Sequence, residues 1–236
     1  MLRKELTRKS PIRILEKSIH GGLGEGNLGV FTSRKGVGKT ACLVHVATDK
    51  MLRGQYVLHI SFEDDPHYIE NWYNQVFHEV SQAYKLSDAF DIKDEIIRNR
   101  LILNFKKDCL DFEEIEEKIE QFLKTIDFKP HCLIVDRFPF DTATPEQVKP
   151  WKEYAAQHQC EIWFSATLHR EALQLDASNI PAPVNSFKDL FSVIIMLDPM
   201  EGYVDLKLLK DHDTEDLERL RLKLDPHTLL IANHRV

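Results

Sequence analysis

The stretch FTSRKGVGKTAC contains the side chains that a phosphate-binding loop needs. Gly36 and Gly38 let the backbone curl so that its N–H groups point at phosphate oxygens, while Lys39 supplies a positive charge. Thr40 supplies a hydroxyl that can hold magnesium. The usual pattern, G-x-x-x-x-G-K-[ST], begins with a glycine where this chain has Ser33. Serine costs little there unless its backbone must take a positive φ, so the stretch still predicts a nucleotide site.

We expect the loop as a whole to contact the nucleotide. Its residues are Ser33, Arg34, Lys35, Gly36, Val37, Gly38, Lys39, Thr40 and Ala41. The expected metal ligands are Thr40 and Asp136, because the apolar run HCLIVD ends in a carboxylate that can lie beside magnesium. The predicted cofactors are therefore ATP and Mg²⁺, although these residues alone leave the choice between ATP and GTP open.

The elements that must position these residues follow from the periodicity of the apolar side chains. We expect strands at residues 28–32, 56–62, 100–105, 131–136, 160–169, 190–198, 203–211 and 227–233. We expect helices at residues 40–53, across much of 66–98, at 111–128 and at 149–157. Helices and strands alternate first and strands cluster late. This order predicts an α/β fold with a mostly parallel central sheet, covered by helices, and late antiparallel strands.

Residues 111–128 give the clearest helical pattern in the chain. Asp111 and Glu114 have the spacing of a capping box, in which each side chain accepts a backbone N–H at the helix start. Apolar residues recur at helical spacing and predict the buried face. They are Ile115, Ile119, Phe122 and Ile126.

Length and composition indicate one globular domain. The chain has 236 residues, of which 43% are hydrophobic and 29% charged, with a net charge of -7. We expect a basic N-terminal arm at residues 1–17 and a single domain at 18–236. The four cysteines are far apart in the sequence, and no apolar run is long enough to cross a bilayer. These features predict a cytoplasmic protein with no membrane partner.

Four stretches together resemble the RecA-like P-loop ATPases, in particular the branch with KaiC and the DnaB-type helicases. They are GGLGEGNLGVFTSRKGVGKT, VLHISFED, HCLIVD and WFSATLHRE, and they occur in the family's order. A weaker fifth match is DLKLLKDH followed by LRLKLDP. The resemblance covers the chain from about residue 18 to residue 230. It implies a RecA-like fold, hydrolysis of ATP, and assembly into a homo-oligomer.

The resemblance also implies roles for individual residues. Glu63 would orient and deprotonate the water that attacks the γ-phosphate, and Asp64 or Asp65 could substitute for it. His169 would sense the γ-phosphate. The helicase branch places an arginine late in the chain, but this chain has His212 there, which leaves Lys210 as the candidate to reach a neighbouring subunit's nucleotide.

Several functions stay open at this point. The leading hypothesis is a regulatory or assembly switch whose nucleotide state is read by a protein partner. A DNA-handling motor is the second, but the loops expected to line a DNA channel carry Arg137 and Arg170 as their basic residues among more acids. A scaffold that binds nucleotide without turnover and a P-loop kinase are further alternatives. A dimeric ATPase with a second, signature lysine is disfavoured, because Arg34 occupies that position and Lys35 is displaced by one residue.

Overall fold

The computed structural model describes residues 7–8, 10–63, 65–83, 89–168, 174–214 and 217–233. Its helices are α2 (Ile12–Ser18), α3 (Lys39–Leu52), α4 (Pro66–Ala83), α5 (Ala89–Ile97), α6 (Phe112–Thr125) and α7 (Pro145–His158), with a short 3-10 helix η1 (Val184–Phe187). Its strands are β1 (Leu28–Ser33), β2 (Val57–Ser61), β3 (Arg100–Asn104), β4 (Cys132–Asp136), β5 (Glu161–Thr167), β6 (Val193–Met200), β7 (Tyr203–Asp211), β8 (Leu222–Leu224) and β9 (Ile231–Asn233).

These strands form one sheet in the order β3-β2-β4-β5-β1-β6-β7-β8-β9. The pairs from β3 to β6 are parallel, and the pairs from β6 to β9 are antiparallel. The prediction of an α/β fold with a mostly parallel sheet and late antiparallel strands is therefore confirmed. Parallel strands need helical crossovers, which explains why helices alternate with strands only in the first part of the chain.

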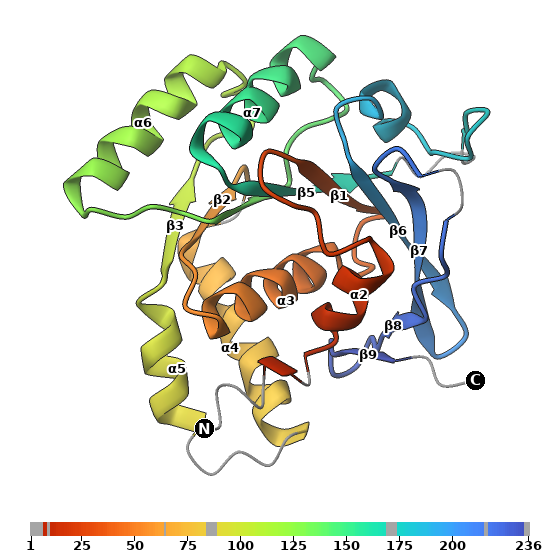
Figure 1. The fold of residues 1–236 in the computed structure, drawn as a ribbon, viewed down its shortest axis with the longest axis horizontal. Coiled ribbons are helices and arrows are strands. Elements are labelled where there is room, and N and C mark those ends of the chain that lie inside the picture. The colour runs from red at the N-terminus through yellow and green to blue at the C-terminus, as the bar shows by residue number, and fades with distance from the viewer. Residues whose placement is uncertain are drawn as a thin grey trace.

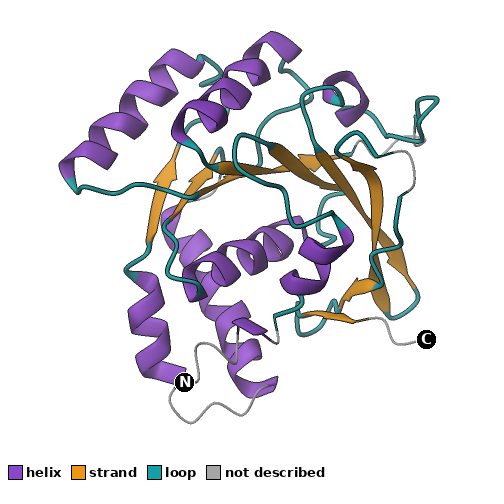
Figure 2. Cartoon of the chain, in the orientation of Figure 1, coloured by secondary structure: helices purple, strands orange, loops and turns teal. Residues whose placement is uncertain are grey.

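Helices cover both faces of the sheet (Figure 1). Helices α6 and α7 lie on one face, whereas α2, α3, α4 and α5 lie on the other, with α3 under the middle of the sheet (Figures 1 and 2). Each face has its own buried apolar cluster. The two clusters meet through alternate residues of the strands, as in β1, where Val30 belongs to one and Phe31 to the other. None of the helices in the described residues has the length and apolarity of a bilayer span.

The N-terminal segment contributes a helix that packs on α3. Ile12 and Leu15 of α2 are buried in the same cluster as α3. Glu16 of α2 accepts hydrogen bonds or ion pairs from its own helix and from the end of α3, with Arg13 at 2.6 Å and Arg53 at 3.0 Å. Residues 12–17 of the predicted basic arm are therefore part of the folded layer on this face.

The buried face of α6 differs from the prediction. Ile115 and Ile119 are buried as expected, but Phe122 is 51% and Ile126 is 53% exposed. The fourth apolar position is Leu123, which lies four residues after Ile119 and so stays above it on the helix. The orientation of α6 against the sheet therefore decides which of its apolar side chains are buried, and the predicted residues Phe122 and Ile126 point away from it.

The capping of α6 and α7 explains where these helices begin. The Asp111 carboxylate accepts the Glu113 N–H at 3.0 Å, so Asp111 is the N-cap, but the predicted return contact from Glu114 is not seen because Glu114 pairs with Lys118. Helix α7 begins at Pro145, earlier than predicted. The Thr144 N–H donates to the Gln147 side chain at 2.9 Å, which is half of a capping box.

Candidate functional site

Four parallel strands end beside one another at the site. In the order β2-β4-β5-β1 they are neighbours, and because they are parallel their carboxyl ends share one edge of the sheet. The phosphate-loop sequence follows β1, Glu63 follows β2, Asp136 ends β4, and Thr167 ends β5. The sheet thus brings together groups that are more than one hundred residues apart in the sequence.

The loop between β1 and α3 has the conformation that its glycines allow. Gly36 and Gly38 have φ values of 83° and 119°, a region that other residues rarely adopt. A Cβ on Gly38 would also lie 2.3 Å from Leu224 Cδ2, so a late strand packs directly against the loop. Ser33 pairs with Thr167 as the last residue of β1 and has no positive φ, so serine replaces glycine there without strain.

Lys39 points back over this loop. Its ammonium donates to the Ser33 carbonyl at 3.1 Å, the Ser33 hydroxyl at 3.3 Å and the Arg34 carbonyl at 3.0 Å. Burial lowers the pKa of Lys39 to about 8, against the opposing effect of the nearby Asp136 charge. A buried cation with few counter-charges is a favourable place for an anionic group such as a phosphate.

The two predicted metal ligands lie in contact. The Thr40 hydroxyl donates to Asp136 Oδ2 at 2.8 Å, and Asp136 is 1% exposed. Its other oxygen accepts a short hydrogen bond from the Ser165 hydroxyl, which in turn accepts the Arg137 N–H at 2.8 Å. Within the described ranges, no three His, Cys, Asp or Glu side chains gather as a metal site. A hydroxyl and a carboxylate fit Mg²⁺, which usually completes its shell with water and substrate phosphates.

Glu63 stands at the same edge and is held by two cations. Arg137 Nη1 donates to Glu63 Oε2 at 3.1 Å, and Lys107 Nζ lies 3.6 Å from Oε1. Partial burial raises the pKa of Glu63. The hydrogen bond from Arg137 and the charges of Lys107, Arg137 and Lys35 lower it by more, so the pKa lies below its usual range. Glu63 is therefore a carboxylate at neutral pH and a weak base.

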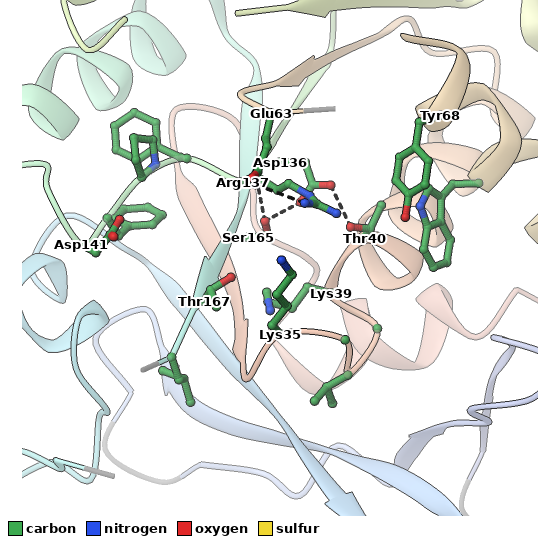
Figure 3. A pocket seen from close by; sticks show the side chains of 18 of the residues that line it. Lys35, Lys39, Thr40, Glu63, Tyr68, Asp136, Arg137, Asp141, Ser165 and Thr167 are labelled. Carbon is green, nitrogen blue, oxygen red and sulfur yellow. Dashed lines mark hydrogen bonds and ion pairs between the residues drawn. The ribbon is translucent and has the colours of Figure 1, made fainter. Parts of the chain in front are cut away.

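These groups line one cavity of about 470 Å³ (Figure 3). That volume is within the range of about 300–1,000 Å³ that is common for small-molecule sites. Residues 35–40 form its floor, and Tyr68 and Trp72 of α4 form an aromatic wall, with their rings 6.3 Å apart and edge to face. Pro226 and Leu229, in the turn between β8 and β9, also line the cavity, as do residues 138–141 after β4.

The structure does not bring every predicted residue to this cavity. Ser33 and Ala41 are buried beside the loop and Arg34 is exposed, and none of the three lines the cavity. Lys210 donates instead to the Lys188 carbonyl at 2.8 Å. His169 lies outside the described residues.

Sequence reasoning missed many of the residues that line the cavity. Among them are Tyr68, Trp72, Lys107, Ser165 and Thr167. A signal existed for the last two, because β5 was expected to end at the site and alternate residues of a strand share a face. No local pattern marks the others, since α4 and the segment after β3 reach the cavity only through the tertiary fold.

The chain matches no protein-family model, and a comparison with curated proteins finds no match.

Proposed function

We propose that this chain binds ATP with Mg²⁺ and hydrolyses it. The observation that carries the proposal is the 2.8 Å contact between Thr40 and Asp136, which come from α3 and β4 and lie beside the Lys39 ammonium in one cavity. A glycine-rich turn alone could arise by chance. A turn that also joins a lysine, a hydroxyl and a buried carboxylate has the complete set of groups needed to hold a magnesium-bound triphosphate.

We further propose a RecA-like ATPase. The support is that the four stretches carrying the resemblance contain the carboxyl ends of the neighbouring strands β2, β4, β5 and β1, which lie at the same edge of the sheet. Under this proposal, the loop N–H groups and Lys39 hold the phosphates, and Thr40 and Asp136 hold the metal. Bound Mg²⁺ would neutralise charge on the phosphate oxygens. Glu63 would orient the attacking water rather than strongly deprotonate it, because its pKa is lowered.

The aromatic wall is the best place for the nucleotide base. Tyr68 is 44% exposed, although large aromatic rings are usually buried, and it faces the cavity with Trp72. Rings of this kind offer apolar and stacking surface to a purine. Tyr68→Ala is therefore expected to weaken the binding of ATP without changing the affinity for inorganic phosphate.

A switch role has support in the contact between the loop and the late strands. Leu224 of β8 packs against Gly38, and His45 of α3 contacts the Leu229 carbonyl at 2.9 Å. A nucleotide that moves the loop would thus move the turn between β8 and β9. We propose that a protein partner, or a second copy of the chain, reads this change. In the described part of the loop after β4, Arg137 pairs with Glu63, which gives DNA little to bind there.

The test is steady-state phosphate release from ATP with magnesium. Wild type, Lys39→Ala and Glu63→Gln should be compared, each with and without single-stranded DNA. We expect turnover in the wild type, loss of ATP binding in Lys39→Ala, and loss of turnover with binding retained in Glu63→Gln. Absence of ATP binding by the wild type would refute the proposal. Strong stimulation by DNA would favour a motor over a switch.

A further inference from the structure

Arg137 has an unusual backbone that fixes the direction of its side chain. It follows β4 directly and has a φ of 59°, which is uncommon for a residue other than glycine. Its N–H donates to Ser165 Oγ at 2.8 Å, and the same hydroxyl bonds to Asp136. A strained residue held by its neighbours is a frequent feature of functional sites.

The side chain of Arg137 projects into the cavity. Figure 3 shows it directed toward Glu63, with Asp136, Thr40 and Lys39 around it in this view. Its guanidinium donates to Glu63 Oε2 at 3.1 Å and lies 6.0 Å from the ring of Tyr68. All of these residues, and Ser165 that anchors the Arg137 backbone, line the same cavity.

Arg137 also lies near the lysine of the loop. Both side chains line the cavity, where four cations, with Lys35 and Lys107, face the three carboxylates of Glu63, Asp136 and Asp141. The cations outnumber the acids, so an anion between Lys39 and Arg137 would add the missing counter-charge. The arrangement is therefore complementary to a terminal phosphate placed between Lys39 and Arg137.

We propose that Arg137 contacts the terminal phosphate of ATP and supplies, from within the same chain, the permanent positive charge that stabilises the transition state. This inference rests on the proposed function. Arginine suits the role because its charge is permanent and its planar fork can bond a carboxylate and a phosphate oxygen together. The same contact would align Glu63, and so the water, with the phosphorus atom.

The proposed reaction needs only ATP and water as reactants. The water oxygen bonds to the γ-phosphorus as the bond from that phosphorus to the β,γ-bridging oxygen breaks, and the bridging oxygen leaves on ADP with the electron pair. The water proton passes to the released phosphate, directly or by way of Glu63. Arg137 forms no covalent bond, and it stabilises the charge on the γ-phosphate oxygens.

The experiment compares wild type with Arg137→Ala, Arg137→Lys and the surface control Lys149→Ala. We expect Arg137→Ala to lower kcat by about 10³-fold, as for other arginines that stabilise phosphoryl transfer. Affinity for ADP should stay unchanged, because ADP lacks the phosphate that Arg137 would contact. Free guanidinium at a non-denaturing concentration should restore part of the turnover of Arg137→Ala but not of Lys39→Ala. Arg137→Lys should recover little, because the fork is lost.

The possible results distinguish the failure of this inference from the failure of the proposed function. A wild type that turns over ATP, with Arg137→Ala equally or more active, would overturn the role of Arg137 and leave the ATPase intact. Equal loss of ADP and ATP affinity in a folded Arg137→Ala would also overturn it, since the effect would then be structural. A wild type that binds no ATP would overturn both. Wild-type turnover per chain that does not change on dilution would support a charge supplied within the chain.

Discussion

Ser165 is expected to hold the Asp136 carboxylate in place, and replacing it with alanine tests this directly. Ser165 is 1% exposed, and its hydroxyl takes part in two hydrogen bonds, one donated to Asp136 Oδ1 and one accepted from the Arg137 N–H. Ser165→Ala removes one oxygen atom and leaves the backbone of β5 unchanged. The carboxylate then loses a donor, and a partly buried N–H loses this acceptor.

The magnitude follows from these two losses. A hydrogen bond to a charged group contributes about 1.5–3 kcal/mol, and an unsatisfied buried donor costs about 1–3 kcal/mol. The two effects share one oxygen and are not fully additive. We therefore expect the free energy of unfolding to fall by about 3 kcal/mol, which corresponds to a fall in Tm of about 6–12 °C for a chain of this size.

The assay is urea unfolding of Ser165→Ala beside the exposed-serine control Ser178→Ala. We expect the m-value to stay constant and the midpoint to fall only for Ser165→Ala. Magnesium-dependent ATP hydrolysis should also fall, because Asp136 is free to turn away from Thr40. A change in unfolding free energy of less than about 0.5 kcal/mol, the size of an ordinary surface effect, would refute this reasoning.

Three further predictions concern the loop and the N-terminal layer. Burial lowers the pKa of Lys39 to about 8, and a bound phosphate would raise that pKa. ATP affinity measured by calorimetry should therefore be constant below about pH 8 and fall about tenfold per pH unit above it. An affinity that does not change with pH would contradict this prediction. Gly38→Ala should destabilise the protein more than Gly202→Ala in thermal unfolding, because both glycines have positive φ but only the first meets a neighbouring side chain. Asp49→Ala should lower the free energy of unfolding in urea by about 3–5 kcal/mol, because this buried carboxylate pairs with Arg13 of α2 and with Arg53 at the end of α3. The same variant should expose α2 to protease, and unchanged digestion would argue against docking of α2 by this ion pair.

The loop was predictable from sequence because its chemistry is local. Gly36, Gly38, Lys39 and Thr40 lie within five positions, and the flanking strand and helix each have a clear apolar pattern. Asp136 was predictable for a similar reason, as the end of an apolar strand. The structure adds that this aspartate contacts Thr40, a fact that depends on β4 and β1 lying on either side of β5.

The contacts within the rest of the site could not be predicted, because they join distant segments. Ser165 lies in a strand that was expected to end at the site, but only the pairing of β4 with β5 places its hydroxyl beside Asp136. Arg137 was counted as a basic residue of a loop, whereas its positive φ turns it toward Glu63. The exposed Phe122 of α6 gives the same lesson for the core, since an apolar pattern identifies a helix better than it identifies the residues that face the sheet.

The magnesium dependence of ATP binding in wild type and in Thr40→Ala tests whether Thr40 and Asp136 hold the ion. Calorimetric titration with ATP should be made with magnesium and then with a chelator. We predict that magnesium strengthens binding to the wild type, and that this gain is lost in a folded Thr40→Ala, because its hydroxyl and Asp136 together hold the ion. Equal binding by the two proteins under both conditions would contradict the magnesium site and with it the proposed ATPase.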